Sequence, residues 1–339
     1  MEYPRKPITI KEVAERAGVA ISTVSRVLND LDRVSDETRQ KVQQAAQDLG
    51  YVKNNLAASM KTGSTKLIVV IVPDIINEYY TAVIQGAEEV AVSRGYYTLV
   101  FSTNDSKQKE EQLFRGQFDR IIDGVIIIPA HDNMEFLKQL KKPVVIVDRY
   151  VPGSHMEAVV IDNFKGSYLL AKELVDAGHR DIGLLMGPLT FNIGQERLGG
   201  FYRAMEEGGV PVQQQYIKEC TWYMESGYEK AMELLSMEHP PTAIYATNNL
   251  LCIGCVEAIA NKGLRLGKDI SLVGFDDTLL AKYMDPGITV VRRATIQMGR
   301  LGAEKLLNKL QGVPNENDTR KIVMDVELIR RGSVVRLNS

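Results

Sequence analysis

The sequence predicts an α/β protein: a small N-terminal domain of three helices, followed by a larger body built on parallel sheets. Before residue 62, every periodic segment has the apolar spacing of an amphipathic helix. After residue 66, short apolar runs alternate with amphipathic helical segments, which is the pattern of parallel α/β sheets. The small polar stretch at residues 62–65 lies between the two parts and indicates a linker.

The composition is that of a folded globular chain. The 339 residues are 45% hydrophobic and 25% charged, which excludes a mostly disordered or fibrous protein. No apolar run approaches the ~20 residues of a membrane helix, and the N-terminus lacks the apolar segment of a secretory signal. Three cysteines are too few for a disulfide framework. We therefore expect a cytoplasmic protein with no membrane segment.

Charge is distributed unevenly along the chain. Residues 1–66 hold 11 Lys+Arg against 8 Asp+Glu, whereas the remainder holds 30 against 35. A basic head on an acidic body is compatible with nucleic-acid binding by the head, although many solvated helical faces carry as much charge.

Start and stop signals predict three helices in the head. Thr9 is a candidate N-cap for a helix over residues 10–17, which Gly18 ends. A second helix is expected over residues 21–29. Ser35 opens a third helix, which runs through residue 49.

The first two helices are joined by a tight turn that contains Gly18, which is the arrangement of a helix-turn-helix. In that motif the second helix lies in the major groove, and its first residues reach base edges. The short hydroxyl side chains of Ser22 and Thr23 allow close approach, and Arg26 can contact a guanine or a phosphate. The alternative is a structural three-helix domain with a solvated face.

Residues 9–14 (TIKEVA), 17–19 (AGV) and 22–29 (STVSRVLN) resemble the N-terminal signature of LacI/GalR-type transcriptional repressors, nearly position for position. One departure is Ala20, where the family usually has a serine that caps the recognition helix. The resemblance implies that the head binds operator DNA. The head residues that it assigns to DNA contact are Thr9, Ile21, Ser22, Thr23, Ser25, Arg26 and Asn29.

Residues 51–61 resemble the hinge segment of the same family. In the family two hinges pair across a dimer and insert a leucine into the minor groove, which kinks the duplex. Met60 holds that leucine position, so Leu56, Ala57 and Met60 are predicted to contact DNA. The alternative is an amphipathic linker that packs on the body.

The body is expected to contain eight or so strands with helices between them. Sheets of this kind bind ligands outside the carboxyl ends of their strands, so the residues after each strand are candidate site residues. The strands are predicted at residues 67–72, 97–101, 124–128, 144–147, 158–161, 181–186, 243–246 and 271–274.

The body resembles the effector-binding core of the LacI/GalR family, which is related to periplasmic sugar-binding proteins. The motifs are residues 147–149 (VDR), 161–163 (IDN), 178–182 (GHRDI), 197–201 (RLGGF), 271–277 (SLVGFDD) and 286–289 (PGIT). The resemblance implies a periplasmic-binding-protein-like core of two Rossmann-like subdomains linked by three chain crossings. The expected division is a DNA-binding domain (1–53), a hinge and linker (54–65), a first effector subdomain (66–161 with 292–323) and a second (162–291 with 324–339).

Matched one position at a time, the resemblance places eight residues in an effector cleft. Trp222 falls at an aromatic position that stacks on a sugar or a base, although burial in a core accounts for many tryptophans. The full set is Tyr79, Tyr80, Asp148, Arg149, Arg197, Trp222, Asn249 and Arg293.

Two departures from the family pattern predict an acidic effector. Asn249 replaces the usual aspartate, and Arg293 replaces the usual glutamine. Each change makes the cleft more positive by one unit, so with Arg197 nearby the site is expected to clamp a carboxylate. Sugar acids such as uronates or 2-keto-3-deoxygluconate are favoured over neutral sugars and phosphosugars. The alternative is that Arg149 or Arg293 pairs with Asp148 and serves the structure alone.

No catalytic or metal-binding pattern is found in the sequence. The four histidines are far apart, and Cys252 and Cys255 lie in an apolar helical stretch despite their redox spacing. We expect no enzymatic activity, no metal and no cofactor.

The sequence therefore predicts a homodimeric repressor of carbohydrate catabolic genes, more narrowly of sugar-acid catabolism. A two-fold protein demands a two-fold site, so the operator is expected to be pseudo-palindromic. A small-molecule effector in the cleft is expected to release the DNA. A second hypothesis is a catabolite-control-type global regulator of the same fold, controlled by a protein corepressor. The DNA-binding head argues against a periplasmic receptor.

Overall fold

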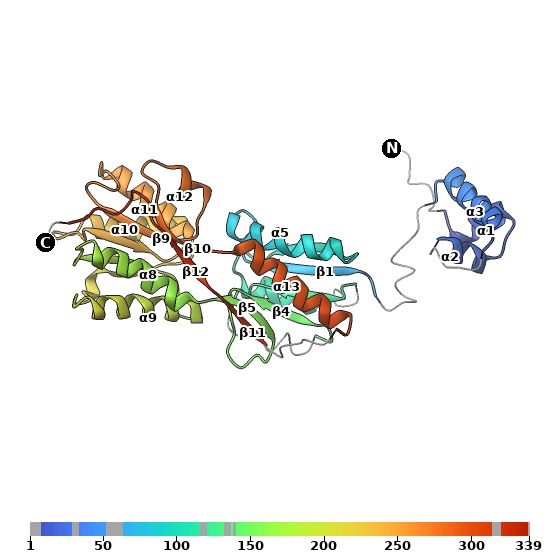
Figure 1. Cartoon of the computed structure of the whole chain (residues 1–339), viewed down its shortest axis with the longest axis horizontal. Coiled ribbons are helices and arrows are strands. Elements are labelled where there is room, and N and C mark those ends of the chain that lie inside the picture. The colour runs from blue at the N-terminus through green and yellow to red at the C-terminus, as the bar shows by residue number, and fades with distance from the viewer. Residues whose placement is uncertain are drawn as a thin grey trace. The chain divides into compact units, whose positions relative to one another are not determined.

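The computed structural model describes residues 8–28, 34–51, 64–115, 121–131, 137, 140–313 and 320–337. The chain forms two compact units, Met1–Thr65 and Lys66–Ser339. Each unit, drawn as a ribbon in Figure 1, contains its own cluster of buried apolar residues.

The first unit is a three-helix domain. Its helices are α1 (Ile10–Ala17), α2 (Ile21–Leu28) and α3 (Asp36–Leu49). The capping signals predict both ends of α1 and α3 correctly, and α2 begins at the predicted residue and ends one residue before the predicted end. Gly18 and Gly50 follow α1 and α3 in the left-handed conformation, with φ of 65° and 62°. One apolar face of each helix contributes to the core. The predicted helix-turn-helix is confirmed.

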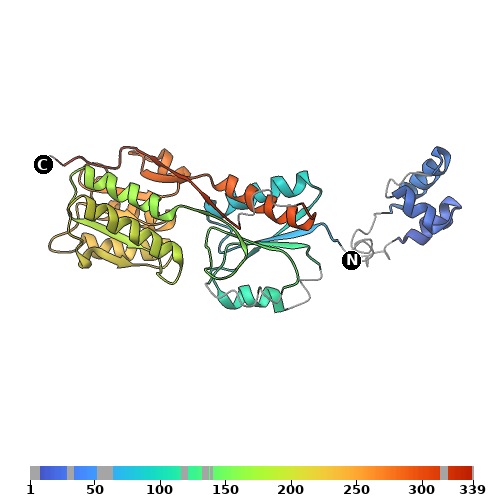
Figure 2. The same cartoon turned by 60° about the horizontal axis from the view of Figure 1, so that its bottom comes forward.

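The second unit consists of two α/β subdomains, each built on a six-stranded sheet. The first sheet has the order β11-β5-β4-β3-β1-β2, and the second has the order β12-β10-β9-β8-β6-β7. Among the described residues all pairings are parallel except that of β10 with β12. Figure 2 shows helices on both faces of the sheets. The predicted fold class is confirmed.

The bounds of the elements are as follows. The strands are β1 (Leu67–Val72), β2 (Tyr97–Ser102), β3 (Gly124–Ile127), β4 (Val144–Val147), β5 (Glu157–Ile161), β6 (Ile182–Met186), β7 (Ile217–Glu219), β8 (Ala243–Ala246), β9 (Ser271–Phe275), β10 (Thr289–Arg293), β11 (Lys321–Met324) and β12 (Val326–Ile329). The helices are α5 (Glu78–Ser93), α6 (Lys107–Arg115), α8 (Asn163–Asp176), α9 (Asn192–Glu207), α10 (Met224–Leu235), α11 (Asn249–Asn261), α12 (Leu279–Tyr283) and α13 (Thr295–Leu310).

The sequence pattern predicts eight of these strands, with shifts of one residue at some ends. It does not predict β7, β10, β11 or β12. Strands β7, β11 and β12 are short and partly exposed, so they lack a continuous apolar run. Strand β10 ends in two arginines, which interrupt its apolar pattern.

The chain passes between the two subdomains three times. Strand β5 is followed by α8, β10 by α13, and β11 by β12, and each step changes sheets or subdomains (Figure 1). Strand β10 continues through Arg293, which pairs with Val326 of β12. Arg292 and Arg293 therefore lie in the second sheet, whereas the sequence-based division places them in the first subdomain.

Close helix packing positions two arginines of the cleft. Helices α5 and α13 touch at Gly299, where a Cβ atom would lie 2.0 Å from a backbone oxygen of α5. Helices α8 and α9 touch at Gly200, where a Cβ would lie 2.3 Å from a backbone oxygen of α8. Because α13 begins two residues after Arg293 and α9 carries Arg197, these contacts fix the position of elements next to both arginines.

Candidate functional site

A small cavity lies between the two subdomains, at the carboxyl ends of strands from both sheets. Its volume is about 20 Å³, which leaves room for about one water molecule. All eight residues that the sequence places in the effector cleft line this cavity, and their binding of an effector stays a prediction. The lining residues are Asn77, Tyr79, Tyr80, Asp148, Arg149, Ile193, Arg197, Trp222, Asn248, Asn249, Asp276 and Arg293.

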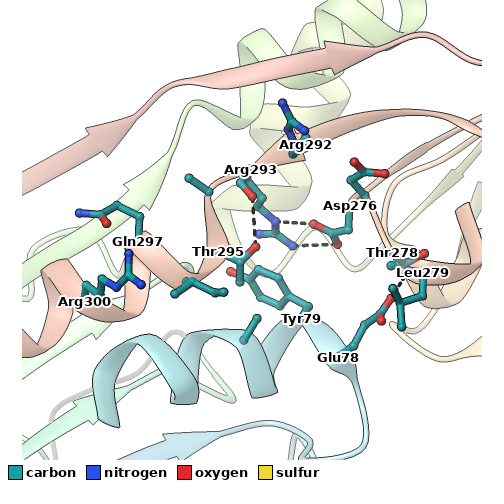
Figure 3. Close-up of a pocket in the computed structure, with 14 residues that line it drawn as sticks. Glu78, Tyr79, Asp276, Thr278, Leu279, Arg292, Arg293, Thr295, Gln297 and Arg300 are labelled. Carbon is teal, nitrogen blue, oxygen red and sulfur yellow. Dashed lines mark hydrogen bonds and ion pairs between the residues drawn. The ribbon is translucent and has the colours of Figure 1, made fainter. Parts of the chain in front are cut away.

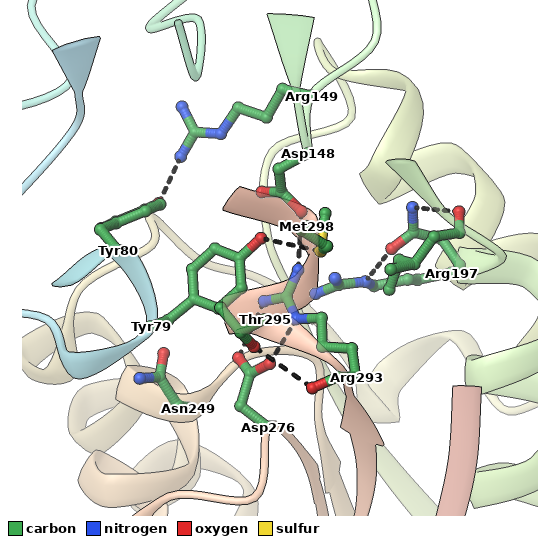
Figure 4. Close-up of polar contacts among 12 residues, drawn as sticks. Tyr79, Tyr80, Asp148, Arg149, Arg197, Asn249, Asp276, Arg293, Thr295 and Met298 are labelled. Atoms are coloured by element: carbon green, nitrogen blue, oxygen red, sulfur yellow. Dashed lines mark hydrogen bonds and ion pairs between the residues drawn. The ribbon is translucent and has the colours of Figure 1, made fainter. Parts of the chain in front are cut away.

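Arg293 lies at the centre of a buried ionic network (Figure 4). Its Nε and Nη2 donate to the two carboxylate oxygens of Asp276 at 2.5 and 2.9 Å. Its Nη1 donates to Asp148 Oδ1 at 2.6 Å. The guanidinium carbon lies 3.5 Å from the centre of the Tyr79 ring. Burial alone lowers the pKa of Arg293, but the neighbouring carboxylates raise it well above its ordinary value.

The two aspartates hold equivalent places in the two sheets. Asp148 directly follows β4, and Asp276 directly follows β9. Both have left-handed backbones, with φ of 67° and 74°, a conformation that aspartate tolerates better than most residues. This turn at the end of each strand brings both carboxylates to the same guanidinium.

The network corrects the role expected for Arg293. The sequence counts Arg293 as a free cation that clamps an effector, whereas two carboxylates already neutralise it. The alternative pairing with Asp148 is the one that forms. The physical reason is that a buried arginine is stable only when a carboxylate compensates its lost hydration.

Arg149 is neutralised by a different carboxylate. Its Nη1 donates to Asp105 Oδ1 at 2.5 Å and to the backbone oxygen of Pro129 at 3.0 Å. Its Nη2 donates to the Tyr80 hydroxyl at 3.2 Å. Its Nε is buried and has no hydrogen-bond partner in the described part of the chain. The guanidinium also lies 5.7 Å from the Trp222 ring centre.

Arg197 has no carboxylate partner among the described residues. Its Nε donates to Asn163 Oδ1 at 3.0 Å, and its Nη1 donates to the backbone oxygen of Thr247. Its guanidinium carbon lies 3.8 Å from the Phe275 ring centre. Burial, and then the charge of Arg293, lower the pKa of Arg197. Arg197 is therefore the arginine of this cavity that forms no ion pair with a carboxylate of the described residues, while the charges of Asp276 and Asp148 still favour its protonated form.

Trp222 is 92% buried, but its surroundings differ from those of a residue packed in an apolar core. Its indole Nε1 has no hydrogen-bond partner within the described residues, and the ring lines the cavity. Gly187 makes room for the ring, because a Cβ there would lie 2.2 Å from Trp222 Cη2. The Asn248 side chain donates to the Trp222 backbone oxygen at 3.0 Å and so holds this segment in place.

Side chains of the two subdomains also meet directly across the cavity. Asn249 Nδ2 donates to Asn77 Oδ1 at 2.7 Å, and Asn77 Nδ2 donates back at 3.4 Å. Glu78 Oε1 accepts the backbone N–H of Leu279 at 3.2 Å. The cleft is therefore closed on its own side chains.

Sequence reasoning missed four of the lining residues, namely Asn77, Ile193, Asn248 and Asp276. A signal for Asp276 was available, because it follows a predicted apolar strand just as Asp148 does. Asn77 and Asn248 are N-caps of α5 and α11 and accept backbone N–H groups there. Their amide Nδ2 groups reach across to other segments, which no local pattern indicates.

A larger groove of about 470 Å³ lies beside this cavity (Figure 3). The start of α5, the loop before α12 and the start of α13 form its walls. Tyr79, Asp276 and Arg293 line both the groove and the cavity. These three side chains therefore form the partition between them.

The surface of α2 is arranged as a recognition helix requires. Val24 and Val27 are buried in the head core, whereas Ser22 and Arg26 are exposed. Thr9 begins α1 as predicted, and its backbone N–H donates to Glu12 Oε2 at 2.6 Å. Of the other residues expected to contact DNA, Asn29, Leu56, Ala57 and Met60 lie outside the described residues.

Neither a cluster of potential metal ligands nor a membrane-spanning helix occurs among the described residues. No group of three or more histidine, cysteine, aspartate or glutamate side chains is placed to hold a metal ion in this part of the chain. No helix there is long and apolar enough to cross a membrane.

Comparison with known families and proteins agrees with this architecture. The family described as "Bacterial regulatory proteins, lacI family" matches residues 9–54, and "Periplasmic binding protein-like domain" matches residues 171–334. The regulator DegA of Bacillus subtilis is 35% identical over 98% of this chain and 99% of its own. The repressor CytR of Escherichia coli is 31% identical over 96% of both chains.

Solved structures show the same fold along the whole chain. A Lac repressor dimer bound to operator and the anti-inducer ONPF is 26% identical and covers 97% of this chain and 100% of its own, with a TM-score of 0.85. A complex of the regulator CelR with cellobiose is 28% identical and covers 96% of this chain and 99% of its own, with a TM-score of 0.73. The chain therefore belongs to the LacI family: it is a helix-turn-helix transcriptional repressor with a periplasmic-binding-protein-like effector domain.

Proposed function

We propose that this protein binds a pseudo-palindromic operator as a homodimer and is released by a sugar acid bound in the cavity of its effector domain. One helix such as α2 covers only a few base pairs, so a two-fold dimer doubles the contact. A repressor of this kind acts on chromosomal DNA, which places it in the cytoplasm.

The observation that carries the effector proposal is an excess of unpartnered donors. Arg293 already binds Asp148 through one carboxylate oxygen and Asp276 through both, which leaves fewer acceptor positions for the hydroxyl groups of a sugar. The donors Arg149 Nε and Trp222 Nε1 remain buried without an acceptor within the described residues. A ligand rich in acceptor oxygens satisfies them.

The negative charge of the proposed effector is assigned to Arg197. Arg197 forms no ion pair with a carboxylate among the described residues, and a guanidinium binds a ligand carboxylate with charge-assisted hydrogen bonds. A monoanionic sugar acid supplies one such group and several further oxygens. This geometry replaces the two-arginine clamp that the sequence predicts.

We expect galacturonate, glucuronate or 2-keto-3-deoxygluconate to bind in isothermal titration, and galactose and glucose not to bind. Arg197→Gln should weaken binding of the acid by about 2–4 kcal/mol, the range for truncating one partner of a buried charge pair. Arg203→Gln is the matched control, because Arg203 lies on the same helix but is half exposed and pairs with Glu207. Equal binding of neutral and acidic sugars would contradict the proposal.

A second candidate function is control by a protein corepressor. The observation that favours it is the cavity of about 20 Å³, which the protein's own side chains close. If this candidate holds, no sugar acid changes operator affinity, whereas a cell extract that contains the corepressor does.

For the head we expect Arg26→Ala to lower operator affinity by about 1–3 kcal/mol, because an exposed arginine on α2 is placed to contact a base edge. The measurement is a fluorescence-anisotropy titration with an operator selected from random duplexes and with random DNA. Equal losses on both would show that Arg26 contacts a phosphate instead.

A further inference from the structure

We propose that the cleft contains a guanidinium-binding subsite and that Arg293 occupies it as an internal ligand, which closes the two subdomains without any effector. The proposal takes from the proposed function only the identity of the cavity as the effector site. Arg293 is then the residue that determines which ligand groups the cleft accepts.

The surroundings of Arg293 are those of a bound ligand. Asp276 binds the guanidinium in bidentate fashion, Asp148 binds the remaining nitrogen, and the Tyr79 ring covers its face at 3.5 Å. Bidentate carboxylates and an aromatic face are the groups by which proteins recognise guanidinium. The side chains of both aspartates are at least 93% buried, so water contributes little to holding the cation.

The same cation joins the two subdomains. Asp148 follows a strand of the first sheet, whereas Asp276 and Arg293 belong to strand ends of the second sheet. Without the guanidinium, the buried carboxylates of Asp148 and Asp276 would face each other across the cleft. Repulsion between these like charges disfavours the form in which the two subdomains are in contact. The arginine thus replaces the ligand that would otherwise be needed for closure.

Occupation of the subsite also determines specificity. With Asp148 and Asp276 engaged, the cavity presents donors and few free acceptors. A neutral sugar, whose hydroxyl groups donate to carboxylates, finds fewer acceptor positions there. An effector with acceptor oxygens would bind beside Arg293 once the cavity, which has room for about one water molecule, has widened.

The chain carries its own reporter, because Trp222 is the only tryptophan and lines the cavity. The test follows Trp222 fluorescence and its quenching by acrylamide in the full-length chain, without DNA or sugar. In wild type, the fluorescence of Trp222 should be shielded from acrylamide. Arg293→Ala should shift the emission to longer wavelength and raise the quenching constant several-fold. Millimolar methylguanidinium should reverse both changes in the variant and leave wild type unchanged.

Arg292→Ala is the matched control, because this neighbour is half exposed and pairs with Glu327 at the surface. It should behave like wild type. Equal concentrations of sodium chloride should not rescue Arg293→Ala. If that variant does not fold, Arg293→Gln keeps most of the side-chain volume without the charge and provides the comparison of emission and quenching, whereas the methylguanidinium rescue is expected only for Arg293→Ala, which empties the subsite.

Three outcomes would overturn the inference: freely quenched Trp222 in ligand-free wild type, unchanged quenching in the Arg293 variants, or a change in Arg293→Ala that methylguanidinium does not reverse. None of these readouts involves an acid or operator DNA. A failure of the sugar-acid proposal in titration therefore leaves this test unaffected, and the converse also holds.

Discussion

Replacement of Asp276 by alanine is expected to lower the free energy of unfolding of the effector domain by about 3–5 kcal/mol, the range for breaking a buried ion pair by removing one partner. The change removes both carboxylate oxygens that bind Arg293 Nε and Nη2 and leaves the buried guanidinium with Asp148 alone. Urea denaturation followed by circular dichroism measures the loss.

The control for Asp276→Ala is Glu327→Ala, which removes the partner of Arg292. That pair has an N–O distance of 2.6 Å, close to those of Arg293, but its side chains are 51% and 63% exposed. Its removal should change the free energy of unfolding by less than about 1 kcal/mol, because water and salt screen the pair. Similar losses in the two variants would show that burial does not strengthen the Arg293 network.

The second large effect is expected at the contact of α5 with α13. A Cβ at Gly299 would lie 2.0 Å from Val83 O, and one at Gly86 would lie 1.9 Å from Ile296 O. Backbone atoms cannot rotate away as side chains do, so Gly299→Ala forces the helices apart. We expect a loss of at least about 2–3 kcal/mol in the free energy of unfolding, measured in urea.

Gly302 supplies the comparison within the same helix. A Cβ there would meet only side-chain atoms, Val147 Cγ2 at 3.0 Å and Ile126 Cγ2 at 3.8 Å, and the nearer methyl group can shift. Both substitutions gain about 1 kcal/mol of helix propensity, so the difference between them isolates the backbone clash. Gly302→Ala should therefore be nearly neutral. If Gly299→Ala were equally mild, the close approach of α5 and α13 would not exist in solution.

The sequence alone determined the head of this protein and its family. Thr9, Ser35 and the glycines after α1 and α3 act within one helical turn of their own position, so local capping rules place the helix ends correctly. The apolar strands of the body were predictable for a similar reason, because a fully buried strand carries its signal in its own residues. The motifs around these elements identified the family before any contact was known.

The charge of the cleft was decided by tertiary structure. All eight cleft residues predicted from the sequence line the cavity, but counting Arg293 as a free cation was wrong. Arg293 is 17 residues from Asp276 and 145 residues from Asp148 along the chain. Only the convergence of β4, β9 and β10 at their carboxyl ends brings these groups within hydrogen-bond distance. Neutralisation of a buried charge depends on neighbours in space, and for this arginine no local pattern contains them.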